Sequence, residues 1–209
     1  MRKFLSLALL CGLALSAVGY AGAKKRVLIL GDSISEGYGI SKQASFPSVL
    51  QNILQERGYT GVEVIDAGIS GSTSASGPGR LRWYLKGRPK AGVSEVLVLE
   101  LGANDGLRGL SPAEMKTNLR AVIRLAKENA MGVLLVGMKA PPNYGKTYDR
   151  DFDGVFPALA REEKVALMPF LLEKVAGEPR LNQEDGIHPN EQGASIVARN
   201  VFRYLEPLL

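Results

Sequence analysis

The feature that most constrains the fold is a series of short apolar runs separated by stretches of helical periodicity. The run from Val27 to Leu30 stops at Gly31 and is typical of a strand that is buried on both faces. Comparable runs recur along the chain. They predict five strands, at residues 27–30, 62–67, 95–101, 132–137 and 165–168.

Amphipathic helix patterns fill the intervals between these strands. Ser111-Pro-Ala-Glu114 is a capping box with proline at the first helical position, which predicts a helix start. The apolar faces of the expected helices contain Phe46, Val49, Leu50, Ile53 and Leu54; Leu81, Tyr84 and Leu85; Met115, Leu119, Val122, Ile123 and Ala126; Phe152, Val155, Phe156 and Leu159; and Ile196, Val197, Val201, Tyr204 and Leu205. Residues 138–148 are expected to form a loop. Strands that alternate with helices predict an α/β fold, with a parallel sheet covered by helices on both faces.

Residues 1–23 have the pattern of a secretory signal peptide. Arg2 and Lys3 precede an apolar stretch at residues 4–18, and Ala21-Gly-Ala23 has the small side chains of a cleavage site. The stretch is short for a membrane-spanning helix, which makes a membrane anchor the less favoured alternative. We therefore expect a periplasmic or secreted monomer, without stable membrane insertion, in which residues 24–209 form a single domain.

Charge and cysteine content argue against several functions. The formal charge of +5 becomes +3 when Arg2 and Lys3 are removed, and the scattered basic residues do not form a nucleic-acid footprint. The only cysteine, Cys11, lies in the expected signal peptide, so the mature chain has no disulfide and no thiolate nucleophile. A metal site would have to depend on carboxylates and one histidine. We expect neither a metal nor a cofactor.

Polar residues capable of nucleophilic catalysis follow the expected strands. Ser33 comes directly after the first strand, and ligands bind at the carboxyl ends of strands in an open parallel sheet. The only histidine, His188, is a suitable base for a serine hydroxyl, and Asp185 stands three residues before it. The alternatives are that Ser33 is a turn residue or helix cap and that His188 caps the last helix.

Acyl transfer also requires donors that stabilise an oxyanion, and two further loops offer them. Gly71 can present a bare backbone N–H group, and Asn104 has a side-chain amide. The backbone N–H of Ser33 is a third candidate. A turn glycine and an Asx turn are the structural alternatives for Gly71 and Asn104. For Asp32 we favour a structural role, in which its carboxylate accepts backbone N–H bonds within the turn.

These blocks together resemble the SGNH-hydrolase (GDSL esterase/lipase) family. The resemblance rests on Gly31-Asp-Ser33, on Gly71, on Gly102-Ala-Asn104-Asp and on Asp185-Gly-Ile-His188, which appear in this order along the mature chain. The segments 99–109 and 141–145 are similar to a branch of exported bacterial enzymes described as acyl-CoA thioesterase, lysophospholipase and arylesterase. Ser72 and Asp66 depart from the usual pattern, in which Asp and Asn stand at these positions.

The resemblance implies a three-layer, flavodoxin-like fold around a five-stranded parallel sheet. It implies Ser33 as nucleophile, His188 as base, Asp185 as the acid that orients it, and Ser33, Gly71 and Asn104 as the oxyanion hole. The implied substrate is a small acyl ester, thioester or lysophospholipid. Leu107, Pro141, Pro142 and Tyr144 lie in loops that are expected to line the acyl-binding surface, an expectation based only on position and apolarity.

Other functions fit the sequence less well. Gly145-Lys-Thr147 imitates the end of a P-loop, but the earlier glycine would fall at Ala140. The nucleophile elbow of α/β-hydrolases requires glycine at position 35, which is Ser35. A carbohydrate O-acetylesterase and a non-catalytic flavodoxin-like binding module remain as alternatives.

Overall fold

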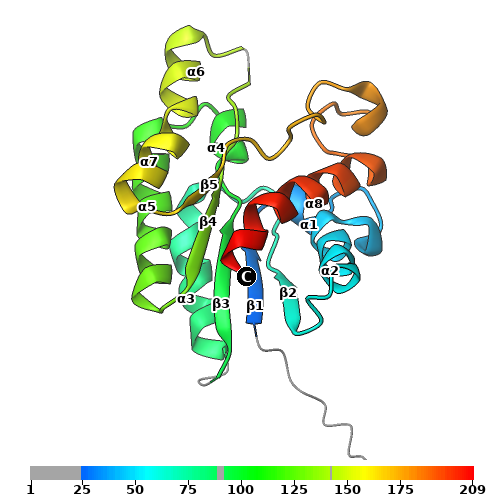
Figure 1. Cartoon of the computed structure of the whole chain (residues 1–209). Coiled ribbons are helices and arrows are strands. Elements are labelled where there is room, and N and C mark those ends of the chain that lie inside the picture. Colours follow the sequence, from blue (N-terminus) through cyan, green and yellow to red (C-terminus); the bar gives the residue numbers. More distant parts are fainter. Residues whose placement is uncertain (1–24, 89–91, 142) are drawn as a thin grey trace, which may run out of the picture.

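The computed structural model describes residues 25–88, 92–141 and 143–209, so the expected signal peptide and Pro142 lie outside the described residues. Five parallel strands form one sheet in the order β2-β1-β3-β4-β5 (Figure 1). The strands are β1 (Lys25–Leu30), β2 (Val62–Asp66), β3 (Ser94–Leu99), β4 (Gly132–Val136) and β5 (Ala166–Met168). The predicted α/β class and the five-stranded parallel sheet are confirmed.

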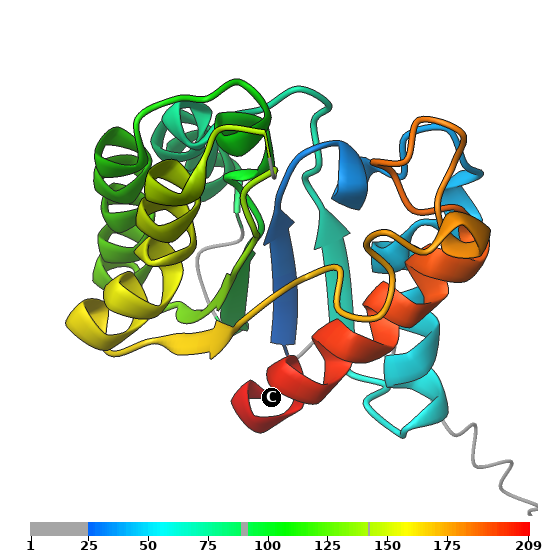
Figure 2. The same ribbon diagram turned by 90° about the horizontal axis from the view of Figure 1, so that it is seen from above.

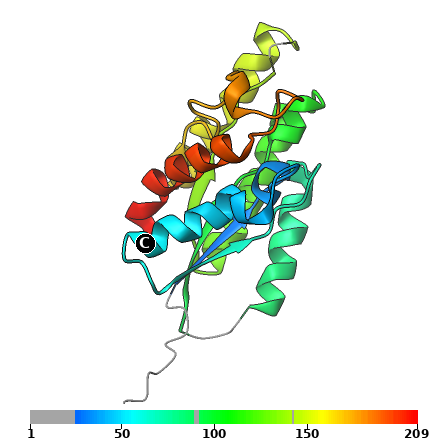
Figure 3. The same ribbon diagram turned by 90° about the vertical axis from the view of Figure 1, so that its right-hand side faces the viewer.

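Helices cover both faces of the sheet and make three layers (Figure 2). On one face α2 and α8 lie side by side (Figure 3), and α3, α5 and α7 cover the other. The α-helices are α1 (Ser33–Glu36), α2 (Phe46–Glu56), α3 (Gly77–Gly87), α4 (Ala103–Leu107), α5 (Pro112–Glu128), α6 (Lys146–Asp153), α7 (Val155–Glu163) and α8 (Glu191–Leu205). Single-turn 3₁₀ helices occur at η1 (Lys42–Ala44), η2 (Ser74–Ser76), η3 (Pro179–Leu181) and η4 (Glu206–Leu208).

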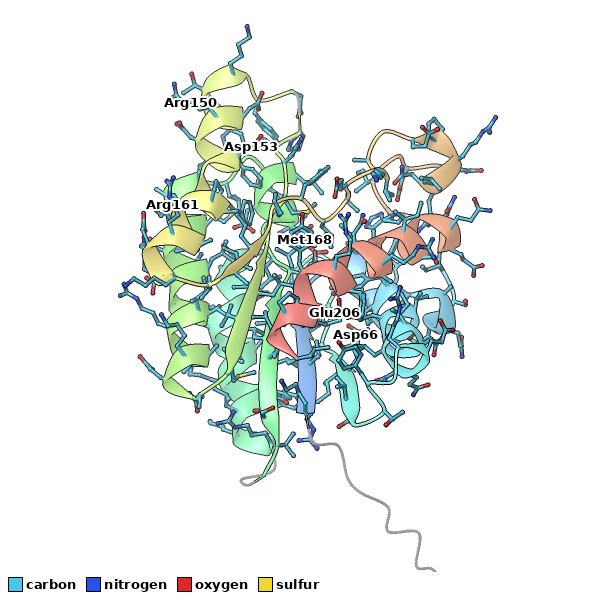
Figure 4. The ribbon with its side chains drawn as sticks, in the orientation of Figure 1. Asp66, Arg150, Asp153, Arg161, Met168 and Glu206 are labelled. Carbon is cyan, nitrogen blue, oxygen red and sulfur yellow. The ribbon has the colours of Figure 1, made fainter. Side chains whose placement is uncertain are left out.

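The core lies between the sheet and these helices. Val27 to Leu30 in β1 and Val96 to Leu99 in β3 are almost completely buried because both strands are internal to the sheet and covered on both faces. Met168, the last residue of β5 (labelled in Figure 4), is also fully buried. The strands thus end in a packed layer, and the loops that follow them emerge together at one edge.

The sequence prediction of helices was wrong in three places. The apolar positions from Phe152 to Leu159 belong to two helices, α6 and α7, which meet at Gly154. Helix α6 begins inside the segment expected to be a loop, because Tyr148 and Phe152 are its only apolar residues and leave almost no periodic signal. The four-residue helix α1 and the five-residue helix α4, which carries Asn104, were also missed because they are too short to show any periodicity.

Within the described parts of the chain, none of the helices combines the length and apolarity needed to cross a bilayer.

Candidate active site

Ser33 lies at the carboxyl end of β1, at the start of helix α1. Asp32 is the N-cap of this helix, and its Oδ1 accepts a hydrogen bond of 3.0 Å from the N–H of Ile34. Gly31 lies between strand and cap against the side chain of Glu100, and a Cβ at position 31 would overlap the Glu100 carboxylate. Glycine at this position lets the turn lie directly over β3, and Ser33 emerges half-buried at the edge of the sheet.

His188 and Asp185 reach the same edge on a loop between η3 and α8. This loop is closed by a bridge between Asn182 and Pro189, and by a 2.8 Å bond from the N–H of Gln183 to the His188 carbonyl. Inside it, Asp185 Oδ1 accepts bonds from the N–H groups of Ile187 (2.9 Å) and His188 (3.0 Å). The carboxylate and the imidazole are therefore held on one small turn.

A row of hydrogen bonds joins the three side chains. His188 Nε2 lies 2.9 Å from Ser33 Oγ, and His188 Nδ1 lies 2.6 Å from Asp185 Oδ2. The Tyr38 ring packs against the imidazole, with ring centroids 4.8 Å apart. The structure thus brings together residues that are 155 positions apart in the chain. The alternative role of His188 as a helix cap does not apply, because Asn190 caps α8.

The Asp185 carboxyl is electrostatically suited to face an imidazole. Partial burial alone would raise its pKa, but the hydrogen bonds from the backbone and ring of His188 and from the Ile187 N–H outweigh this effect. They lower the pKa of Asp185 to about 2, which keeps it ionised at neutral pH. An ionised Asp185 accepts a hydrogen bond from the Nδ1–H group of His188, which leaves Nε2 facing Ser33 Oγ as a hydrogen-bond acceptor.

The three candidate oxyanion donors lie in segments that are joined by hydrogen bonds. Asn104 is in α4, and its Nδ2 donates to Asp32 Oδ2 at 3.3 Å. Gly71 has a φ of +75°, and its carbonyl accepts a 2.9 Å bond from Arg108 Nη2 at the end of α4. Ser33 is the first residue of α1, where the helix provides no acceptor for its N–H group.

The loop that carries Gly71 is hydrogen-bonded to α1 as well as to the end of α4. The N–H of Ser70 donates to Glu36 Oε2 at 2.6 Å, which ties the residue before Gly71 to the helix that begins at Ser33. Asp66 (labelled in Figure 4), which stands where the family pattern has Asn, also holds the start of this loop in place. Its Oδ1 accepts a 2.8 Å bond from the N–H of Gly68, and its Oδ2 pairs with Lys42.

Two carboxyl groups, those of Asp32 and Glu100, are buried beneath the turn at Ser33, and only Asp32 was identified from the sequence. Asp32 accepts bonds from both Ile34 and Asn104, in line with the structural role favoured for it. Glu100 is also buried and accepts a 3.1 Å bond from the N–H of Asp32. The sequence does contain a signal for Glu100, because a charged residue that directly follows the most apolar strand is expected to make a buried polar contact.

A groove of about 480 Å³ adjoins the row of side chains. It is lined by Ile34, Ala103, Leu107, Met138, Lys139, Ala140, Pro141, Phe170, Leu172, Ala176, Gly177, Asn182, Gly186 and Ile187. On α6, Asp153 (labelled in Figure 4) holds one wall through a 2.9 Å bond from the Ala140 N–H to Oδ1. The groove is mainly apolar, and its lining includes Ile34, Ala103 and Ile187, which are the chain neighbours of Ser33, Asn104 and His188.

Two of the four residues expected at the acyl-binding surface line this groove, namely Leu107 and Pro141. Tyr144 does not line it. Its hydroxyl donates to the Leu107 carbonyl at 2.8 Å and its ring packs on Tyr148, so it supports the wall from outside. A second hollow, of about 520 Å³, lies beside Arg26, Glu63 and Trp83 and contains none of the predicted site residues.

The side chains of the site are suited to nucleophilic catalysis by a serine hydroxyl. Among the residues described, no three His, Cys, Asp or Glu side chains gather as a group that could hold a metal ion. A serine, a histidine and an aspartate in this order are the arrangement by which serine hydrolases activate their nucleophile. Fold and site together match the arrangement of a serine hydrolase.

Comparison with known proteins gives the family. The model of the GDSL-like lipase/acylhydrolase family matches residues 29–196. The esterase TesA of Pseudomonas aeruginosa is 41% identical over 197 residues, which cover 94% of this chain and 96% of that protein. The thioesterase 1/protease 1/lysophospholipase L1 of Escherichia coli is 38% identical over 189 residues, 90% of this chain and 87% of that protein.

A solved structure agrees with these matches. The psychrotrophic esterase EstA from Pseudoalteromonas sp., in a form inhibited by monoethylphosphonate, has a TM-score of 0.80 and 30% identity, covering 88% of this chain and 97% of that one. The chain therefore belongs to the GDSL-like lipase/acylhydrolase family and is an enzyme that hydrolyses esters. The family and the flavodoxin-like fold implied by the sequence motifs are confirmed.

Proposed function

We propose that this protein hydrolyses carboxylic esters or thioesters of acyl chains through an acyl-enzyme on Ser33. The observation that carries the proposal is the hydrogen-bonded row from Ser33 Oγ through His188 to Asp185, with distances of 2.9 and 2.6 Å. The row lies at the carboxyl edge of the sheet, next to an apolar groove of about 480 Å³.

In the first step, His188 Nε2 takes the hydroxyl proton as Ser33 Oγ attacks the acyl carbonyl carbon. The N–H groups of Ser33 and Gly71 and Nδ2 of Asn104 stabilise the tetrahedral oxyanion. When the tetrahedral intermediate collapses, the bond to the leaving group breaks and the departing alcohol or thiol receives the proton from His188. Asp185 stabilises the imidazolium during this transfer.

In the second step, water completes the reaction. His188 removes a proton from a water molecule, whose oxygen attacks the carbonyl carbon of the acyl-enzyme. Collapse of the second intermediate returns the proton to Ser33 Oγ and releases the carboxylic acid. Both steps use the same base and the same oxyanion donors, so no cofactor is required.

The groove favours acyl chains over acetylated sugars as substrates. Its lining includes Ile34, Leu107, Phe170 and Ile187, which can bury methylene groups but offer few partners for sugar hydroxyls. The names of the relatives, an esterase and a thioesterase/lysophospholipase, support an acyl substrate with an ester or thioester leaving group.

Labelling with a fluorophosphonate tests the proposal. We expect one covalent adduct, on the peptide that contains Ser33, and no adduct in Ser33→Ala. His188→Ala should slow labelling at least 100-fold, since the hydroxyl then lacks its base. An adduct on another residue, or labelling of His188→Ala at the wild-type rate, would refute this mechanism.

We further propose that residues 1–23 direct export and are removed, and that residues 24–209 act as a monomeric single domain. The charged start, apolar stretch and small-residue cleavage site support this proposal. Amino-terminal sequencing of the secreted or periplasmic protein should start at Lys24. Light scattering should then give the mass of one chain.

A further inference from the structure

One buried side chain connects the nucleophile turn to the loop that carries Asn104. Asp32 is completely buried, and each of its carboxylate oxygens accepts one hydrogen bond. Oδ1 accepts the N–H of Ile34 at 3.0 Å, and Oδ2 accepts Nδ2 of Asn104 at 3.3 Å. The first bond fixes the helix that begins at Ser33. The second crosses to α4, 72 positions further along the chain.

The second bond decides which end of the Asn104 amide faces the substrate. An asparagine amide has two ends of similar shape, a donor NH₂ and an acceptor oxygen, which a rotation of about 180° exchanges. An ionised carboxylate only accepts hydrogen bonds, so Asp32 can pair only with the NH₂ end. One N–H of Nδ2 is used by Asp32, and the other remains available for an oxyanion. In the reversed orientation the amide oxygen would repel that oxyanion.

The environment indicates which of the two buried carboxyl groups carries the charge. Glu100 is fully buried beneath the turn, and its Oε1 has no hydrogen-bond partner within the described residues. Burial, with the nearby Asp32 charge, raises the pKa of Glu100 well above its usual range, which favours the neutral form of Glu100. Asp32 accepts two hydrogen bonds and has a pKa of about 6, so it is ionised at pH 8.

We propose that Asp32 is a positioning residue for ester hydrolysis, which holds the Asn104 amide with its NH₂ end toward the oxyanion. This inference rests on the proposed function, in which Asn104 is an oxyanion donor. Asp32 acts through Asn104, and its effect is therefore on the transition state rather than on substrate binding.

The test is a double-mutant cycle at pH 8 with a p-nitrophenyl ester. Asn104→Ala should lower kcat by about 10²–10³-fold, the range for the loss of an oxyanion donor. Asp32→Asn keeps the N-cap but no longer fixes the amide, and should lower kcat by about 10–100-fold with KM changed less than about twofold. In the Asn104→Ala background, Asp32→Asn should cost less than about threefold.

Two further variants control for the fold. Glu100→Gln replaces the buried carboxyl group by a neutral amide of the same shape. Position 100 has no observed hydrogen bond to Ser33 or Asn104, so kcat should stay within about threefold. Asp32→Ser retains a capping hydroxyl but is too short to reach Asn104, and it should show the same non-additive loss as Asp32→Asn. It removes the contact with Asn104 in a second, independent way.

The outcomes separate this inference from the proposed function. The positioning role would be overturned if Asp32→Asn and Asp32→Ser keep the wild-type kcat. It would also be overturned if their losses in kcat multiply fully with the loss in Asn104→Ala. If Asn104→Ala itself loses less than tenfold, the oxyanion assignment fails, and the positioning role fails with it. Survival of Ser33→Ala activity would instead refute the nucleophile assignment.

Discussion

Asp32 places a negative charge where water is excluded, and this arrangement has a cost in stability. Burial raises the pKa of the Asp32 carboxyl from 3.8 to about 6, against the opposing effect of its hydrogen bonds. The folded protein therefore binds this proton more tightly than the unfolded chain does. The free energy of unfolding should fall as pH rises from about 4 to about 6, and the full cost should persist above that range.

Replacement by a neutral isostere should recover this cost. We predict that Asp32→Asn raises the free energy of unfolding at pH 8 by at most about 3 kcal/mol, the amount that corresponds to the displaced pKa. At pH 4 the gain should be close to zero. Urea unfolding of both proteins at the two pH values measures the difference. An equal change at pH 4 and pH 8 would mean that Asp32 is not the titrating group.

The sequence predicted which residues would meet, but not how they are supported. Ser33, Asn104 and His188 each follow a strand or reach the same sheet edge, and a parallel topology brings such segments together whatever their spacing. Glu100 could not be assigned in this way. Its contact with Asp32 depends on the close approach at Gly31, which is a packing detail without a periodic signal.

At the scale of single elements, the start of α8 determines where His188 can lie. Asn190 caps this helix through Oδ1, which accepts the N–H groups of Gln192 and Gly193, and its Nδ2 donates to the Arg180 carbonyl at 2.8 Å. The same side chain thus holds both ends of the loop that carries Asp185 and His188. Helix α5 offers a comparison, because Ser111 caps it far from this loop in the chain.

We predict that the two caps have different consequences when they are removed. Asn190→Ala should lower the free energy of unfolding by about 1–2 kcal/mol, and Ser111→Ala by about 1 kcal/mol. Only Asn190→Ala should also reduce kcat, by about 3–10-fold, since a small displacement of His188 weakens proton transfer. Thermal unfolding and steady-state kinetics on both variants measure these effects. Equal kcat values in the two variants would show that the α8 cap does not position His188.

Element prediction succeeded where periodicity was strong and failed where helices were short or polar. Helices α2, α5 and α8 each show an apolar face over at least 11 residues, and the sequence identified all three. Helix α6 has eight residues and α1 has four, so tertiary contacts rather than pattern decide their conformation. Both helices bear on the site, because α1 begins at Ser33 and α6 supports the groove wall through Asp153.

At the scale of the whole molecule, the groove proposed to bind the acyl chain is assembled from segments spread over most of the chain. Ile34 comes from α1, Leu107 from α4, Ala140 from the loop after β4, Phe170 from the loop after β5, and Ile187 from the loop before α8. Its volume depends on how these loops pack together, which explains why the sequence located only part of its lining. If this groove binds the acyl chain as proposed, the complete fold sets the chain length that it accepts.

Each methylene group buried in the groove should contribute up to about 0.8 kcal/mol, which is about a fourfold gain in kcat/KM. We predict that kcat/KM rises with acyl length from p-nitrophenyl acetate until the groove is filled.

Ala140→Phe, which occupies part of the groove with a ring, should cost about three methylene contacts and lower kcat/KM for dodecanoate by about 50-fold. Acetate hydrolysis should stay within about twofold, since an acetyl group has only one methyl group to bury and gains little from the groove. Ala113→Phe, at an exposed position on α5 outside the groove, is the matched control and should leave both substrates unchanged. If Ala140→Phe reduces acetate and dodecanoate hydrolysis equally, the variant has disturbed the catalytic residues, and the groove does not select acyl length.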